Sequence, residues 1–464
     1  MSSWRRTLAL TAVAAMLLAA SSYLEPESPP VRAPQAVTVT EYARACPVQV
    51  NPTKLAVGRV AAHPDAVTDA LELPGLADIG ALGTSDAWAD TTVDKSELRA
   101  VELRSRDGEG AGFVAFSAAH GTGATGGGFA VTECPGVDSE SWFVGAGSST
   151  RHLSTLVLTN LGDTPAIAEV QMFGTNGEVE VVDGDSIVLD AQTTKHLTLD
   201  DVAAGEAELA VRVNTRRGAL AATLRDTSTA VFQGSEWIAP TNAPARVQTI
   251  TGLPSGASDR ELIVVNPGNA TAEINIDVLG KEGTIVADEF DEVKVPAGSL
   301  KTFTVPSSAG SEAISLRLRS SQDIAASVRV ATSDEDFAYG VASGQVVGPA
   351  VIPLAIDGAL EAMKPILMLS AARRPSTVRV EAFDMDMTSR GSTEVDVPAD
   401  RTVAFDLAKS GRFDSSLDDL AYLVVTPARP VRGAVAFVTD STVSILPLAE
   451  APLTVLAPQV QPGR

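Results

Sequence analysis

The chain has 464 residues, a net charge of −23 and 45% hydrophobic residues. This length allows about three or four domains, and the hydrophobic fraction supplies a core for each of them. The acidic residues are spread along the chain, so its surface repels phosphate backbones, which argues against nucleic-acid binding. Solubility is the simplest explanation of the negative charge.

Residues 1–24 have the pattern of a targeting segment. Arg5 and Arg6 precede the uncharged run Thr7–Leu24, which is longer than a signal-peptide core and shorter than a full membrane span. A small-residue cleavage site at Ala19–Ser21 leaves both a cleaved signal peptide and an uncleaved helical anchor open. We favour the anchor, because the uncharged run extends past that site. Either way, the rest of the chain is expected outside the cytoplasm, with the membrane contacted through this segment.

The next residues, 25–40, hold four prolines and little core, which predicts an extended tether. Four domains are predicted to follow, at residues 41–138, 139–245, 246–348 and 349–464, the last with a frayed tail. Short linkers that contain proline join them, for example at Ala239–Pro244. We therefore expect a row of domains that forms a semi-rigid rod.

Each domain is predicted to be a β-sandwich. Apolar and polar side chains alternate along Ala272–Leu279 and again along Ile314–Arg319, which indicates strands buried on one face. Turn residues such as Asn266–Asn269 separate the strands at intervals of about ten residues. This punctuation favours antiparallel sandwiches over βαβ units.

The same landmarks recur about every 105 residues, which is the size of one sandwich domain. A strand that ends in asparagine occurs at Leu156–Asn160 and at Leu262–Asn266, with a weaker copy at Leu367–Ala371. Further landmarks repeat with the same spacing, and the first copy is the most degenerate. The predicted fold class is thus all-β, with tandem immunoglobulin-like antiparallel β-sandwich domains after an N-terminal hydrophobic helix.

The first domain contains both cysteines, Cys46 and Cys134. Two cysteines in an exported chain predict one disulfide. Because Cys46 opens the first strand and Cys134 closes the last, the bond would join the two ends of this domain. Two unpaired buried thiols are the alternative.

No motif in the sequence predicts catalysis, a metal or a cofactor. The nucleophile elbow, the zinc-protease helix motif, the phosphate loop and the calcium loop are all missing. The glycine run Gly121–Gly128 matches a dinucleotide fingerprint, but a strand follows it instead of a helix, so we interpret it as a hairpin loop. The four histidines, which are far apart in sequence, are expected on the surface (His63, His120, His152 and His196).

Two tryptophans, Trp142 and Trp237, lie near the predicted domain junctions. They either pack into seams between domains, which we favour, or mark a ligand groove. Aromatic residues make up only 5% of the chain, so an array of aromatic sugar platforms is the weaker interpretation.

Several turn and strand signatures follow one another at Trp237–Pro240, Gly252–Pro254, Leu262–Gly268 and Val293–Ser299. Their order resembles an uncharacterised actinobacterial family of envelope proteins with a domain of unknown function. The resemblance covers most of the chain from Cys46 onward. It implies β-sandwich repeats behind an N-terminal hydrophobic segment, and it carries no catalytic residues.

The leading prediction is a non-enzymatic extracytoplasmic envelope protein, a modular scaffold or interaction rod whose partners are other envelope proteins or cell-wall polymer. A carbohydrate-binding module array for cell-wall or capsular polymer is the second candidate, and an enzyme of unrecognised type is the third. A concave groove with an exposed tryptophan would favour sugar binding, whereas histidine and acids converging in a cleft would favour an enzyme.

Overall fold

The computed structural model describes most of the chain from residue 35 onward. The described residues are 35–39, 42–48, 52–60, 68–70, 88–93, 99–105, 110–121, 127–229, 233–256, 259–285, 287, 290, 293–306, 309, 312–333, 336–409 and 411–457. The predicted N-terminal hydrophobic helix and most of the predicted tether lie outside these described residues. Within these ranges, no helix is long and apolar enough to cross a membrane.

The described residues form two compact units. In the smaller unit, β1 (Gln35–Thr38) pairs antiparallel with β35 (Thr454–Ala457), so the end of the predicted tether is a strand. The larger unit spans Val39–Leu453 and holds all the other elements described below.

The elements of the larger unit fall into four consecutive repeats. The first repeat comprises β2 (Ala43–Val48), β3 (Thr53–Arg59), β4 (Thr68–Ala70), β5 (Ala89–Val93), β6 (Arg99–Ser105), β7 (Phe113–Gly121) and β8 (Gly128–Glu133). The second comprises β9 (Glu140–Ala146), β10 (Ser148–Ser149), β11 (His152–Asn160), β12 (Ala166–Gly174), β13 (Gly177–Val179), β14 (Ile187–Leu189), β15 (Thr194–Thr198), α2 (Leu199–Val202), β16 (Leu209–Arg217), β17 (Leu220–Thr229) and β18 (Gln233–Ile238).

The remaining elements form the other two repeats. The third repeat comprises β19 (Ala245–Leu253), β20 (Asp259–Asn266), β21 (Ala272–Leu279), β22 (Thr284–Ile285), β23 (Val293–Val295), β24 (Ser299–Thr304), β25 (Ile314–Ser333) and β26 (Asp336–Val341). The fourth comprises β27 (Ala350–Pro353), β28 (Lys364–Ala371), β29 (Ser376–Phe383), β30 (Ser389–Val397), β31 (Arg401–Asp406), η3 (Leu417–Asp419), β32 (Tyr422–Pro427), β33 (Val431–Val438) and β34 (Val443–Pro447).

Every repeat is a sandwich of two antiparallel sheets, which confirms the predicted fold class. In the second repeat one sheet has the order β13-β12-β16-β9 and the other β10-β11-β17-β18. The fourth repeat has the same pattern, with β30-β29-β32-β27 facing β31-β28-β33-β34. In the third repeat, the long strand β25 belongs to both sheets, because its two halves pair with different partners. The predicted limits of the four domains stay a prediction.

The predicted alternation is visible in β21. Its apolar side chains Ala272, Ile274 and Val278 are buried in the sandwich, while Glu273 and Asn275 face outward. A strand with this pattern can bury only one face, so each sheet needs a second sheet to cover it. The sequence pattern therefore sets both the strand and its place in a sandwich.

The asparagine at the end of the recurring strand ties two loops together. The Nδ2 group of Asn160 donates to the carbonyl oxygens of Thr164 and Asp190, at 2.8 and 2.9 Å. Asn266, 106 residues later, makes the same bonds to Ala270 and Pro296, at 2.8 and 3.1 Å. Both asparagines are fully buried. The landmark is therefore a satisfied buried amide that holds the loops around the strand end.

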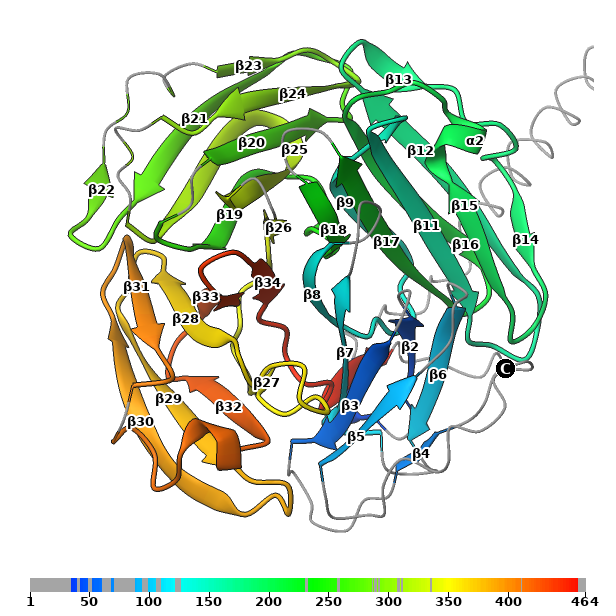
Figure 1. Cartoon of the computed structure of the whole chain (residues 1–464). Coiled ribbons are helices and arrows are strands. Elements are labelled where there is room, and N and C mark those ends of the chain that lie inside the picture. The colour runs from blue at the N-terminus through cyan, green and yellow to red at the C-terminus, as the bar shows by residue number, and fades with distance from the viewer. Residues whose placement is uncertain are drawn as a thin grey trace, which may run out of the picture. The chain divides into compact units, whose positions relative to one another are not determined.

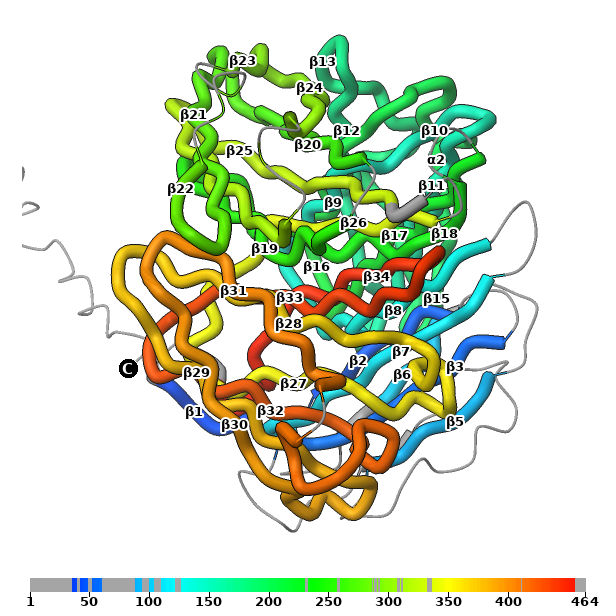
Figure 2. The backbone as a smooth tube through the Cα atoms, turned by 60° about the vertical axis from the view of Figure 1, so that its left-hand side comes forward, coloured from blue at the N-terminus to red at the C-terminus, as the bar shows by residue number. Residues whose placement is uncertain are grey.

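The last strand of each repeat lies against those of the neighbouring repeats. Figure 1 shows β8, β18, β26 and β34 in the middle of the larger unit, and Figure 2 shows β8 beside β34. Two hydrogen bonds from backbone N–H groups connect these neighbours. The N–H of Ser235 donates to the carbonyl of Gly127, just before β8, at 2.8 Å, and the N–H of Val131 donates to the Ser444 hydroxyl at 3.0 Å. We call these four strands the inner strands.

The expected row of domains is therefore wrong. The repeats contact one another well beyond their linkers, because single apolar clusters contain residues of more than one repeat. Trp88 of the first repeat stacks on Tyr422 of the fourth, with ring centroids 4.9 Å apart, and donates its indole N–H to the Ala355 carbonyl at 2.8 Å. A second shared cluster joins the second repeat to the third, and another joins the third to the fourth. Burying apolar surface between repeats favours one unit over a rod.

The predicted disulfide is confirmed. Cys46 in β2 is bonded to Cys134, which follows β8, and both are completely buried. They lie in a small cluster formed by first-repeat residues only, including Leu55 and Phe113. The bond thus crosses the first repeat, which has the smallest core of its own.

Candidate functional site

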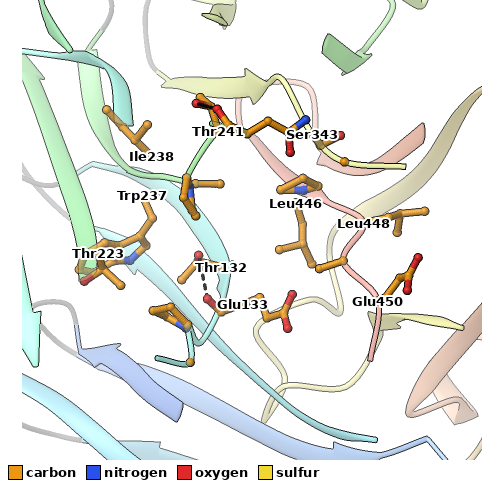
Figure 3. A pocket seen from close by; sticks show the side chains of 18 of the residues that line it. Thr132, Glu133, Thr223, Trp237, Ile238, Thr241, Ser343, Leu446, Leu448 and Glu450 are labelled. Atoms are coloured by element: carbon orange, nitrogen blue, oxygen red, sulfur yellow. Dashed lines mark hydrogen bonds between the residues drawn. The ribbon is translucent and has the colours of Figure 1, made fainter. Parts of the chain in front are cut away.

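A cavity of about 390 Å³ opens at one end of the inner strands. The cavity is lined by the ends of the inner strands and the segments that follow them, within residues 132–136, 237–242, 343–346 and 446–450. Figure 3 shows side chains from all four segments around one space, with Trp237 and Leu446 on opposite sides. We call this space the axial cavity. It belongs to no single repeat and exists only when all four are assembled.

Apolar side chains line opposite sides of the axial cavity. Trp237 and Ile238, at the end of β18, lie on one side, and Leu446, at the end of β34, and Leu448 lie on the other. Pro240 also lines the cavity. Trp237 is only 5% exposed, because its ring is packed into the wall. The other predicted tryptophan, Trp142, does not line the cavity and stacks on Phe173 inside the second repeat, at 5.7 Å between centroids.

The polar part of the cavity carries hydroxyl and amide groups, including Thr132, Thr241, Asn242 and Ser343. The Arg44 guanidinium also lines it, but its charge is balanced. Arg44 Nη1 lies 2.6 Å from Glu133 Oε1 and donates to the Cys134 carbonyl at 2.6 Å. An apolar wall with a few fixed polar groups is the usual lining of a small-molecule site.

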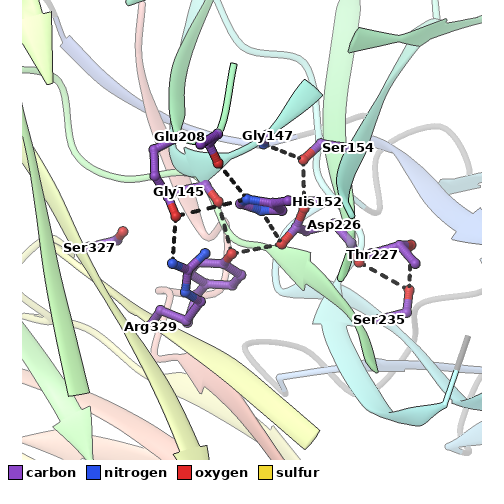
Figure 4. A network of polar contacts seen from close by, with 12 residues as sticks. Gly145, Gly147, His152, Ser154, Glu208, Asp226, Thr227, Ser235, Ser327 and Arg329 are labelled. Carbon is purple, nitrogen blue, oxygen red and sulfur yellow. Dashed lines mark hydrogen bonds and ion pairs between the residues drawn. The ribbon is translucent and has the colours of Figure 1, made fainter. Parts of the chain in front are cut away.

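A second group of polar side chains lies where the second and third repeats meet, and we call it the seam cluster. Its members are His152, Ser154, Glu208, Asp226, Arg329 and Tyr339 (Figure 4). Tyr339 on β26 reaches across the seam and places its hydroxyl 2.7 Å from Asp226 Oδ2. Gly145 on β9 has a φ of +111°, and a Cβ there would meet the Tyr339 ring at 2.6 Å. A glycine is therefore required for this close approach.

The hydrogen bonds of His152 keep its imidazole charged. Nε2 lies 3.0 Å from Asp226 Oδ2, and Nδ1 lies 2.7 Å from the Ala207 carbonyl oxygen. Burial lowers the pKa of His152, but the Asp226 charge and its hydrogen bond outweigh burial and raise that pKa to about 9. Burial raises the pKa of Asp226, but His152, Ser154 and Tyr339 together hold it below its usual value.

This geometry is not that of a catalytic triad. Ser154 Oγ donates to Asp226 Oδ1 at 2.6 Å and makes no bond to the imidazole. A serine nucleophile needs a neutral histidine nitrogen as its base, and both nitrogens of His152 face acceptors. The arrangement instead ties β11 to β17 by a buried ion pair and β26 to β17 by the hydrogen bond from Tyr339. A cavity of about 370 Å³ adjoins it.

The surface position expected for His152 is wrong, because this residue is buried in the seam. His120 and His196 are exposed as expected, and His63 lies outside the described residues. Nothing in the sequence pointed to the partners of His152, because Asp226 follows it by 74 residues and Tyr339 belongs to another repeat.

A pair of acids is buried among the inner strands. Asp336 Oδ2 accepts N–H groups from Phe129 and Val443, at 3.2 and 3.0 Å. Burial raises the pKa of Asp336 to about 7, although these hydrogen bonds act to lower it. Burial also raises the pKa of Glu236 well above its usual value, with a further contribution from the Asp336 charge. Among the described residues, no three histidine, cysteine or acidic side chains come together to hold a metal ion.

The glycine run at Gly121–Gly128 joins β7 to β8, which pair as an antiparallel hairpin. The interpretation as a strand–strand connection is thus confirmed, although residues 122–126 lie outside the described part. Gly128 has a φ of +105°, and a Cβ there would meet Asp336 Oδ1 at 2.3 Å. This glycine makes room for the buried acid.

The sequence analysis found Trp237 but missed the rest of the axial cavity. A signal does exist, because a proline follows three of the four inner strands or ends them, at Pro135, Pro240 and Pro447. The first two are 105 residues apart and the last two 207. A proline ends strand pairing, so the chain turns away there and leaves space.

The comparisons with known proteins give the chain a family but no activity. No curated protein matches the chain. Among solved structures, it is similar to the tetra-tandem repeat in the extending region of a large adhesion protein, with 11% identity over 87% of this chain and 93% of that chain. The TM-score of 0.09 is too low for that likeness to carry an argument. A model of a family of unknown function, DUF5719, matches residues 89–408, more than half of the chain. The chain therefore belongs to the DUF5719 family, whose function is unknown.

Proposed function

We propose that this protein is a non-catalytic binding protein of the cell envelope. Its axial cavity would hold a short glycan segment of a cell-wall or capsular polymer. One observation carries the proposal: a single cavity is lined by all four repeats, and its lining combines a tryptophan with hydroxyl and amide groups. A sugar ring offers an apolar face to an aromatic side chain and hydroxyls to polar ones.

The extracytoplasmic location is part of the proposal. The Cys46–Cys134 disulfide supports it, because such bonds persist mainly in oxidising compartments. The pattern of residues 1–24 supports it as well, either as an anchor or as a cleaved signal. An actinobacterial source stays a prediction.

A non-catalytic role is supported by the chemistry of the described side chains. The charge of Arg44 is balanced by Glu133. Both nitrogens of His152 are engaged with acceptors in the seam cluster. The scaffold role predicted from the sequence is thereby made more specific. A compact unit with a cavity shared by all four repeats takes the place of a row of separate modules.

The proposal is tested by titrating the purified full chain with cell-wall and capsular oligosaccharides, by calorimetry and by tryptophan fluorescence. We expect one binding site per chain. Trp237→Ala should weaken binding at least about tenfold, equivalent to about 1.4 kcal/mol. Trp142→Phe is the matched control and should bind as the wild type does, because Trp142 lies outside the cavity.

Because Trp237 is buried, its loss also affects folding, so Asn242→Ala is measured alongside. Asn242 lines the polar part of the cavity and is only half-buried. Weaker binding by both variants, with an unchanged melting temperature for Asn242→Ala, supports the proposal. Wild-type binding by both variants, or cleavage of the oligosaccharide by the protein, would rule it out.

A further inference from the structure

A further cavity, of about 340 Å³, lies where the third and fourth repeats meet. Four arginines line it, Arg317 and Arg319 on β25, Arg432 on β33, and Arg373 after β28. We call it the arginine cavity. A buried hydrogen bond joins the two repeats at this junction: the Thr402 hydroxyl of the fourth repeat donates to the Leu279 carbonyl of the third at 2.6 Å.

The positive charges of the arginine cavity exceed the negative charges that face them. Asp277 accepts from Arg319 Nη2 at 2.9 Å and lies 2.8 Å from Arg317 Nη2, and Asp400 pairs with Arg317 Nη1. Among the described residues, four guanidinium groups thus share two carboxylates. The whole chain has 58 acidic residues and only 35 basic ones, so a local excess of positive charge runs against its composition.

Arg432 shows the effect of this excess. It is half-buried and donates its Nε–H to the Ser343 carbonyl at 3.2 Å. Burial lowers the pKa of this guanidinium, and the Arg317 charge lowers it further. A bound anion would relieve that repulsion, and guanidinium groups suit oxyanions because their paired N–H donors match two oxygens.

We propose that the arginine cavity is a binding site for one phosphate-type oxyanion. The acidic surface repels long polyanions, so the ligand is a single phosphate group carried by a small molecule or by a branch of a polymer. Gln345 lines both this cavity and the axial cavity, so the two are neighbours. Anion binding here does not depend on the glycan proposal.

The test uses inorganic phosphate and the full chain in a low-salt buffer free of phosphate. Calorimetry and the melting temperature should report one site. Arg432→Gln should weaken binding at least about tenfold, and Arg373→Gln, on an exposed side chain, about fivefold. Arg379→Gln is the matched control, because Arg379 is an exposed arginine of the same repeat that does not line the cavity.

A variant that is expected to bind phosphate more tightly is included, because misfolding could explain a loss of binding but not a gain. Asp400→Asn removes one of the two carboxylates, and asparagine tolerates the φ of +55° at this position, so phosphate affinity should rise about threefold. Glycerol phosphate should compete with inorganic phosphate, and glucuronate should compete only weakly. Absence of a phosphate site, or equal affinity in the wild type and all variants, would overturn the proposal. Preference for glucuronate would overturn the choice of phosphate.

Discussion

Two junctions between repeats handle charge in opposite ways. At the seam between the second and third repeats, the charges of the seam cluster are paired, with His152 against Asp226 and Arg329 against Glu208 and Glu261. At the junction of the third and fourth repeats, four arginines face two carboxylates across a cavity. The same sandwich fold thus supports a seam with paired charges and a junction with an excess of positive charge.

The difference separates a structural role from a binding role. A buried ion pair with all its hydrogen bonds made specifies how two elements dock, and removing one partner leaves an uncompensated charge. An excess of one charge around a cavity gives no such stability, but it is complementary to a ligand of the opposite charge. We therefore expect substitutions at the balanced seam to change stability, and substitutions at the arginine cavity to change binding.

The largest effect is expected from Asp226→Ala in the balanced seam. The substitution leaves the charged His152 buried without its partner, which should lower the free energy of unfolding by about 3–5 kcal/mol. Urea denaturation followed by circular dichroism measures this loss. Asp323→Ala is the matched control and should change the free energy by less than about 0.5 kcal/mol, because Asp323 is mostly exposed. Equal effects from the two variants would show that the seam cluster does not stabilise the fold.

The second effect is a pH dependence set by His152. Its pKa is 6.5 in the unfolded chain and about 9 in the folded one, so its contribution is fully present below pH 6.5 and is lost as the pH rises through 9. The loss amounts to about 3 kcal/mol. Denaturation at a series of pH values from 6 to 10 measures it. His152→Gln should remove this slope, and an unchanged slope in that variant would contradict the assignment.

The smallest effect is expected at the arginine cavity. Arg432→Gln removes a charge that Arg317 repels, so in low salt without phosphate the variant should lose less than about 0.5 kcal/mol of stability despite the bond to Ser343. Denaturation at 20 mM and 500 mM sodium chloride compares it with the wild type. A loss as large as that of Asp226→Ala would make Arg432 structural and erase the difference between the junctions.

The sequence predicted what depends on neighbours along the chain. Alternation in Ala272–Leu279 gave a strand with one buried face, and the spacing of Asn160 and Asn266 gave the repeat. The disulfide was predictable because only two cysteines exist. The alternation and the disulfide lie within one repeat, and the asparagine spacing compares one repeat with the next.

Contacts between repeats left almost no local signal. The docking of Trp88 on Tyr422 joins residues more than 300 positions apart, and Tyr339 meets Asp226 across a seam. A buried face of a strand looks alike whether its own repeat or another one covers it. For this reason the inner strands, the compact unit and both cavities were missed, and a rod was expected instead.

The central claim is that all four repeats together form the binding site, and hydrogen exchange tests it most directly. The full chain is saturated with the oligosaccharide that binds best, and amide exchange is followed by mass spectrometry. We predict slower exchange in four separate segments, those that follow β8, β18, β26 and β34, one from each repeat. Slower exchange in the segments of a single repeat, or in none of the four at saturation, would contradict a shared axial site.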